Sequence, residues 1–122
     1  FLSKQDPDGA AAIKRLYSDA AVFVLPTLYE PFGISYVEAM AHGLPCIGTN
    51  ICAVPEIIED GVTGRLVAPG DAEALARALI DLLLDSGKAR EFGEAGFRKY
   101  RAQFTWAKVA ERVEEQTRDL CR

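Results

Sequence analysis

A short apolar run that ends at a proline constrains the fold more than any other part of the sequence. The run at 21–25 (AVFVL), followed by Pro26, is apolar throughout and rich in β-branched and aromatic residues. A strand with one face in water alternates apolar and polar residues, whereas a strand buried on both faces is apolar throughout and typical of parallel sheets. The run therefore predicts a strand that is buried on both faces within a parallel sheet.

Helices and strands are predicted to alternate around this run, from caps, glycine and proline stops, and apolar spacing. These signals place helices at 7–19, 33–42, 56–59, 72–83, 88–100 and from 105 onward, and further strands at 45–49 and 65–68. Tyr17 falls on the apolar face of the first helix, and Trp106 is expected to anchor the last helix by packing. Gly93 and Gly96 are expected to weaken the helix at 88–100. The predicted fold class is α/β: a Rossmann-like three-layer domain with a short parallel sheet of three to four strands flanked by helices, and a helical C-terminal third.

The loop between the first strand and the helix at 33–42 has the features of an anion site. The free N–H groups of a first helical turn and the helix dipole favour negative charge there. Gly33 has no side chain to block a ligand's approach to the backbone. Glu30 on the loop and Glu38 on the helix flank these amides. This arrangement suits a ligand with phosphates in the middle and hydroxyls at both ends, as in a sugar nucleotide.

A second loop is expected to face the same ligand. In a parallel sheet, the loops that follow the carboxyl ends of the strands lie at one edge, where ligands bind. The loop at 27–33 leaves one strand at that edge, and the loop at 49–54 leaves the next.

Composition argues against several other kinds of protein. The net charge of −4 and the lack of a basic stripe argue against nucleic-acid binding. No apolar run approaches the roughly 18 residues of a membrane span, so no transmembrane segment is expected. Three cysteines without CxxC spacing argue against a disulfide framework or a zinc site and favour a reducing cytoplasm. The chain has no initiator Met and residues 1–3 resemble the tail of a strand, so we expect a piece of a longer protein.

Further motifs follow the first glutamate in a defined order. Glu30 and Glu38 are separated by seven residues within EPFGISYVEAMAHGLP (30–45), and VPEII (54–58) and DGVTGRLV (60–67) follow. Together these motifs closely resemble the C-terminal domain of the group 1 retaining glycosyltransferases, over nearly the whole chain. The resemblance implies that 1–122 is the C-terminal nucleotide-sugar-binding domain, truncated at its N-terminal side, of a two-domain glycosyltransferase with the GT-B fold.

The resemblance also implies roles for individual residues. Glu30 matches the acid at the donor sugar, and we give this catalytic position a positioning and electrostatic role. Glu38 matches the acid that holds the nucleotide ribose. Phe32, Gly33 and Ile34 match the loop whose backbone amides reach the donor sugar and the pyrophosphate.

The activity implied is retaining transfer of a sugar from a UDP-, GDP- or ADP-sugar to an acceptor, with no metal and no other cofactor. The acceptor would bind the missing N-terminal domain, so this chain by itself is expected to be inactive in transfer. Dimerisation can hide the apolar surface that the missing domain would cover. The parent protein is expected in the cytoplasm, with peripheral membrane attachment left open.

Two departures from the family pattern and two alternative functions stand beside this interpretation. Cys52-Ala53 occupies the place where relatives often have a glycine pair, and the basic pair that clamps the diphosphate lies upstream of this chain. The alternatives are a sugar-nucleotide epimerase of the same architecture and a non-catalytic flavodoxin-like binding module. His42, at the C-terminus of its helix, indicates a surface residue rather than a catalytic base.

Overall fold

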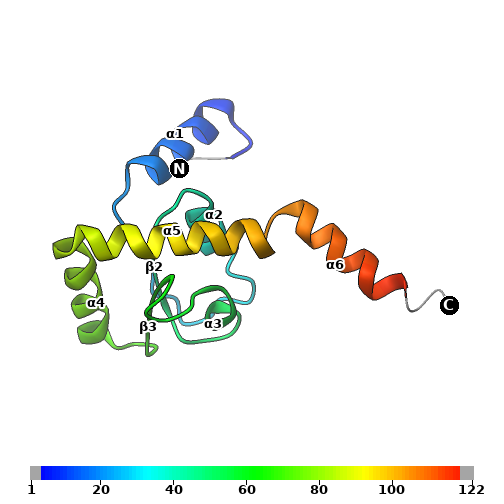
Figure 1. Ribbon diagram of the computed structural model, residues 1–122. Coiled ribbons are helices and arrows are strands. Elements are labelled where there is room, and N and C mark those ends of the chain that lie inside the picture. Colours follow the sequence, from blue (N-terminus) through cyan, green and yellow to red (C-terminus); the bar gives the residue numbers. More distant parts are fainter. Residues whose placement is uncertain (1–3, 119–122) are drawn as a thin grey trace.

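The computed structural model describes residues 4–118 and contains a three-stranded parallel sheet covered by helices (Figure 1). The strands are β1 (Phe23–Leu25), β2 (Cys46–Thr49) and β3 (Gly64–Val67), in the order β1-β2-β3. In the register of the sheet, Ile47 pairs with Val24 on one side and with Arg65 on the other. The predicted parallel sheet and the alternation of elements are confirmed. Residues 1–3, predicted as the tail of a strand, and Cys121 lie outside the described residues.

The helices lie close to their predicted positions because local chemistry sets their ends. They are α1 (Pro7–Asp19), α2 (Ile34–Ala41), α3 (Val54–Ile57), α4 (Ala72–Leu84), α5 (Ser86–Gln103) and α6 (Trp106–Arg118). The Asp6 and Asp71 carboxylates accept hydrogen bonds from the first-turn amides of α1 and α4. Gly43 ends α2 with a φ of 70°, in the left-handed region that glycine tolerates. Within residues 4–118, no helix has both the length and the apolar content needed to cross a membrane.

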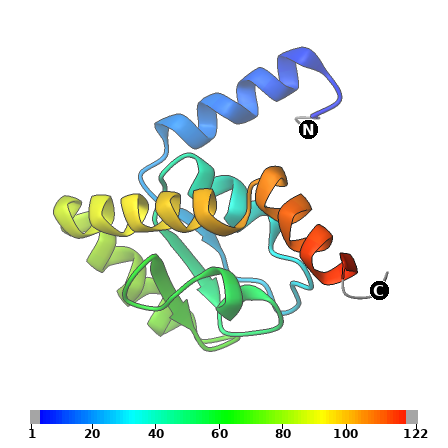
Figure 2. The same cartoon turned by 45° about the vertical axis from the view of Figure 1, so that its right-hand side comes forward.

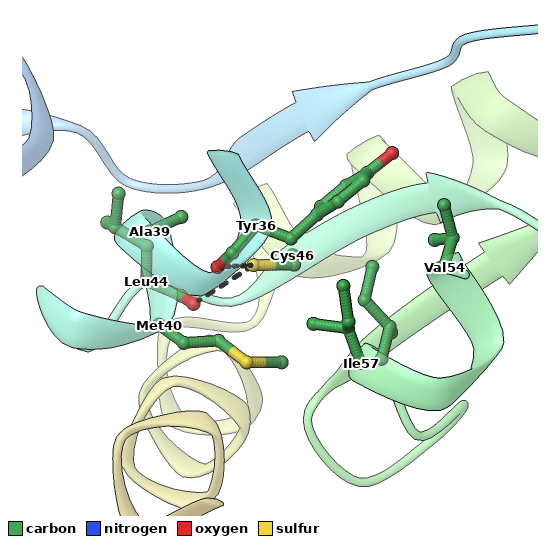
Figure 3. Packing of buried hydrophobic residues seen from close by; sticks show 8 residues of the cluster. Tyr36, Ala39, Met40, Leu44, Cys46, Val54 and Ile57 are labelled. Carbon is green, nitrogen blue, oxygen red and sulfur yellow. Dashed lines mark hydrogen bonds between the residues drawn. The ribbon is translucent and has the colours of Figure 1, made fainter. Parts of the chain in front are cut away.

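Two apolar clusters sandwich the sheet. Helices α2 and α3 cover one face, where the buried cluster contains Tyr36, Ala39, Met40, Leu44, Cys46, Val54, Ile57 and Ile58 (Figure 3). Helix α4 covers the other face, where Ile47, Val67, Ala78, Leu82 and Phe92 are packed together. Neighbouring residues of β2 thus point to opposite faces: the buried Cys46 thiol lies on the α2 side, and Ile47 lies on the α4 side. Helices on both faces give the three-layer arrangement that the sequence predicts.

Helix α5 crosses the amino-terminal edge of the sheet and packs against α2 (Figures 1 and 2). It is a continuous helix of 18 residues, longer than the predicted 88–100, although Gly93 and Gly96 lie in its middle. A Cβ atom on Gly93 would stand 2.0 Å from the Gly43 carbonyl oxygen, and one on Gly96 would stand 3.3 Å from the Met40 side chain. Gly93 therefore faces the turn that follows α2, Gly96 faces α2 itself, and together they permit a close approach of α5 to this part of the molecule.

Two predictions about burial are wrong. β1 is half-buried rather than fully buried, because it is at one end of the described sheet order and has only β2 beside it. Trp106 is 87% exposed instead of acting as a packing anchor, and α6 has no buried residue. Helices α1 and α6 both extend away from the layered part of the molecule (Figure 2).

Candidate functional site

The loop from β1 to α2 is closed by Glu30. Its Oε1 atom accepts a hydrogen bond of 2.9 Å from the Gly33 N–H, and Gly33 is the N-cap of α2. Gly33 has a φ of 67°. This conformation is unfavourable for any residue that has a side chain. Glu30 and Gly33 thus set the path of the chain into α2, and the structure brings these two predicted site residues together.

The missing side chain of Gly33 leaves room for a neighbouring side chain of the protein. It is buried, and a Cβ atom there would stand 2.3 Å from Cδ1 of Ile57 on α3. Its own N–H is engaged by Glu30. The first N–H groups of a helix have no intrahelical partner. The amides of Ile34 and Ser35 are therefore the first amides of α2 that could bind an anion.

Large apolar side chains on the loop between β1 and α2, and at the start of α2, face the solvent. Phe32 and Ile34, two of the predicted site residues, are 74% and 63% exposed, and Leu28 and Tyr29 are also exposed. Exposed apolar groups that gather on one loop often mark a surface that contacts a ligand or a partner. The structure therefore presents Phe32 on the loop that Glu30 closes and Ile34 at the start of α2, both with exposed side chains.

Glu38 lies in the second turn of α2 and is held from α1. Its Oε2 atom accepts a hydrogen bond of 3.2 Å from the Tyr17 hydroxyl, and its Oε1 atom forms an ion pair with the Lys4 ammonium group. The Glu38 side chain keeps about a third of its surface in solvent, with 32% exposed. The two predicted acids thus have separate partners: Glu30 has a partner near its own loop, and Glu38 has partners on α1 and in the segment before it.

Sequence reasoning missed Tyr17 and Lys4. Helical spacing assigns Tyr17 to an apolar face, and nothing local relates it to an acid 21 residues away. Burial, followed by the charge of Glu38, raises the pKa of Tyr17 to about 12. Its hydroxyl is therefore a neutral hydrogen-bond donor at ordinary pH.

The two loops at the carboxyl edge of the sheet lie side by side. The Thr49 hydroxyl, at the end of β2, donates a hydrogen bond of 2.6 Å to the Thr27 carbonyl oxygen, just after β1. A groove of about 310 Å³ opens at this edge, and its lining includes Pro26, Leu28, Thr49, Val67, Ala68 and Leu75. The neighbouring loops fit the expectation that both face one ligand, which stays a prediction.

A second, more apolar groove has Glu38 in its lining. It has a volume of about 390 Å³ between α2, α5 and α6, and its lining includes Ile34, Val37, Glu38, Tyr100, Trp106 and Val109. His42 is exposed, and its Nδ1 atom lies 2.9 Å from the Glu38 carbonyl oxygen, as expected for a surface histidine at a helix C-terminus. Within residues 4–118, no three histidine, cysteine, aspartate or glutamate side chains gather in a way that could hold a metal ion.

Comparison with curated proteins identifies relatives of known activity. The family model described as "Glycosyl transferases group 1" matches residues 5–99. The alpha-maltose-1-phosphate synthase of Mycobacterium tuberculosis is 35% identical over 123 aligned positions, which cover 96% of this chain and 32% of the relative. The chain thus spans about a third of the length of that relative.

Solved structures agree with the sequence comparison. The sucrose-phosphate synthase of Thermosynechococcus elongatus superposes with a TM-score of 0.81 at 38% identity, over 92% of this chain and 28% of that protein. HepE of Anabaena, solved in complex with UDP-glucose, has the same fold, with a TM-score of 0.80 at 24% identity over 88% of this chain and 30% of that protein. The family match, which covers most of the chain, shows that this protein belongs to the group 1 glycosyltransferase family.

Proposed function

We propose that this chain is the C-terminal, donor-binding domain of a retaining glycosyltransferase, which transfers a sugar from a nucleotide sugar to an acceptor. The observation that carries the proposal is the position of Glu30 and Glu38. They lie on the loop and the helix that leave β1 at the carboxyl edge of the sheet, in a chain of this family. The fold that this chain shares with HepE, whose structure holds UDP-glucose, supports a nucleotide-sugar ligand.

The proposed roles are those that the family resemblance implies, and the positions of the residues support them. The Glu38 carboxylate accepts hydrogen bonds from the ribose hydroxyls, and Glu30 holds the loop and places negative charge at the donor sugar. The loop from Phe32 to the start of α2 directs backbone amides at the diphosphate. Because the Gly33 N–H is bonded to Glu30, the amide of Ile34 is the better candidate for this contact.

Charge stabilisation on the leaving diphosphate is the chemistry that this arrangement can supply. Amides fixed at a helix N-terminus stabilise developing negative charge without having to reorganise. We propose transfer without a metal or other cofactor, as the family resemblance implies. The family match favours transfer over the epimerase and flavodoxin-like alternatives.

The remaining parts of the reaction belong, in this proposal, to residues outside this chain. We propose that the acceptor binds a second domain, since the relatives are about three times as long as this chain.

We propose a cytoplasmic location, because Cys46 and Cys52 are both free thiols. In the absence of a second domain, the exposed apolar side chains of α6 and the β1–α2 loop would favour self-association.

Exchange of Glu38 for glutamine tests the proposed function. The variants Glu38→Gln and Glu30→Gln are made in the full-length gene product, with the exposed Glu91→Gln on α5 as a matched control. We expect Glu38→Gln to weaken binding of UDP, GDP or ADP by about tenfold, because a hydrogen bond to a charged group is lost. Glu30→Gln is expected to lower the rate of transfer more than nucleotide affinity.

Calorimetric titration with each nucleotide, and transfer assays with the matching nucleotide sugar, give the two measurements. Unchanged nucleotide affinity in Glu38→Gln, at the level of Glu91→Gln, would contradict the ribose role. Amide chemical shifts that move at residues 32–38 and 49–54 on nucleotide addition would place the ligand at the predicted edge.

A further inference from the structure

The Glu38 carboxylate is held in one orientation by groups from outside its own helix. Tyr17, on α1, donates to Oε2 at 3.2 Å, and Lys4, in the segment before α1, pairs with Oε1. An exposed glutamate on a helix surface usually samples several rotamers, because nothing fixes its side chain. Here each carboxylate oxygen has a donor of its own.

Tyr17 is itself fixed by its neighbours. Its ring stacks on the His42 ring with centroids 5.0 Å apart and an interplanar angle of 16°, and on the Phe23 ring at 6.0 Å. His42 follows α2 and Phe23 begins β1, so Tyr17 is held by the two elements that flank the candidate site. Its hydroxyl is therefore placed by packing, and not only by its bond to Glu38.

The hydrogen-bonding capacity of the carboxylate shows what remains for a ligand. An ionised carboxylate has two oxygens with about four lone-pair sites in all. Tyr17 uses one site on Oε2 and Lys4 uses one on Oε1, which leaves about one site on each oxygen. Two neighbouring hydroxyls, such as the 2′ and 3′ hydroxyls of a ribose, can each donate to one of these oxygens.

We propose that Tyr17 is a positioning residue of the donor site, whose hydroxyl holds the Glu38 carboxylate in the orientation that receives the ribose hydroxyls of a nucleoside diphosphate. This inference rests on the proposed function, because it takes Glu38 as the ribose acceptor. Tyr17 itself touches neither the nucleotide nor the sugar.

The test removes only the hydroxyl. Tyr17→Phe keeps the ring that stacks on His42 and Phe23, and Ser18→Ala removes a hydroxyl from the same helix as a matched control. Both are made in the full-length protein, alone and in a Glu38→Ala background. Affinity is measured by calorimetry for whichever of UDP, GDP and ADP binds most tightly, and for its 2′,3′-dideoxy form.

We expect Tyr17→Phe to weaken the ribonucleotide about three- to tenfold, the effect of one lost hydrogen bond. Its affinity for the dideoxy nucleotide is expected to stay unchanged, as is every affinity in Ser18→Ala. In the Glu38→Ala background, Tyr17→Phe is expected to add no further loss, because its effect passes through Glu38.

The outcomes separate the inference from the proposed function. If Glu38→Ala weakens the ribonucleotide and Tyr17→Phe does not, the inference fails and the donor site stands. If Glu38→Ala also leaves affinity unchanged, the ribose role of Glu38 fails. If Tyr17→Phe weakens both nucleotides equally and lowers the unfolding temperature, Tyr17 has a structural role alone and the inference is overturned.

Discussion

At the scale of single residues, Cys52 has a backbone conformation that disfavours its own side chain. It lies in the loop after β2, and its φ of 46° is the one positive φ of a non-glycine residue in the part of the chain that the structure describes. The family resemblance implies a glycine pair at this place, where this chain has Cys52-Ala53. A side chain makes this left-handed conformation less favourable than it would be for glycine.

Replacement of Cys52 by glycine should therefore stabilise the protein. We expect Cys52→Gly to raise the free energy of unfolding by about 0.5–1 kcal/mol, because the left-handed strain is relieved and the exposed Cys52 side chain loses little packing. Ala53→Gly is the matched control, since Ala53 has an ordinary φ of −79° and glycine should lower stability there. Urea unfolding measures both variants, and equal effects of the two substitutions would contradict this account.

At the scale of elements, the packing of α5 on α2 depends on small residues. Gly93 and Gly96 are buried in α5. A side chain on Gly93 would clash with the backbone of Gly43, and one on Gly96 would make a tight contact with the Met40 side chain. Helix propensity alone predicts that both glycines lower the stability of α5. In the folded protein they set the distance between two helices, and α2 carries Glu38.

Alanine substitutions in α5 should separate propensity from packing. Gly93→Ala is expected to lower the free energy of unfolding by at least about 2 kcal/mol, because its Cβ would stand 2.0 Å from a backbone oxygen that cannot easily move. Gly87→Ala, near the start of the same helix, meets nothing closer than 3.4 Å and should raise stability by about 0.5 kcal/mol. Thermal or urea unfolding of the pair provides the measurement, and a neutral Gly93→Ala would show that the two helices do not need this close approach.

At the scale of the whole molecule, the layered part and the projecting helices differ in how much they bury. The two clusters around the sheet contain fully buried apolar side chains, among them Tyr36, Met40 and Ile47. In contrast, Leu16 of α1 is 62% exposed and Trp106 of α6 is 87% exposed. The sheet and the helices that cover it are therefore expected to provide most of the cooperative stability. The chain spans about a third of the length of the maltose-1-phosphate synthase to which it is similar.

One cysteine thiol and two tyrosine hydroxyls with raised pKa values should make the folded protein less stable at high pH. Burial raises the pKa of the Cys46 thiol to about 12, and burial is also the main cause that raises the pKa values of Tyr17 and Tyr36 to about 12. Above pH 9 to 10, the unfolded chain releases protons that the folded chain retains, so the free energy of unfolding falls as pH rises toward 12.

We expect urea midpoints to be nearly flat from pH 7 to 8.5 and to fall steeply from pH 9.5 upward. Cys46→Ala should lower stability at pH 7 through lost packing but flatten the decline above pH 9, since one titrating group is gone. A decline of the same slope in Cys46→Ala and in the unmodified protein would show that the thiol takes no part.

The sequence by itself determined the order of the elements, several of their ends and the family motifs. Caps and stops act through atoms a few residues apart, so Asp6, Gly43 and Asp71 could be assigned from their neighbours in the chain alone. Glu30 is assigned through the family motif, and its hydrogen bond from the Gly33 N–H, three residues away, comes from the structure.

Only the tertiary structure decided what the elements do to one another. Gly93 lies against the turn that follows α2 within a continuous helix, Trp106 lies in solvent, and Tyr17 reaches an acid 21 residues along the chain. Apolar spacing tells which side of a helix avoids water, but not which element covers it or at what distance. These outcomes depend on how whole layers pack, because burial and contact are set by neighbours that are remote in the sequence.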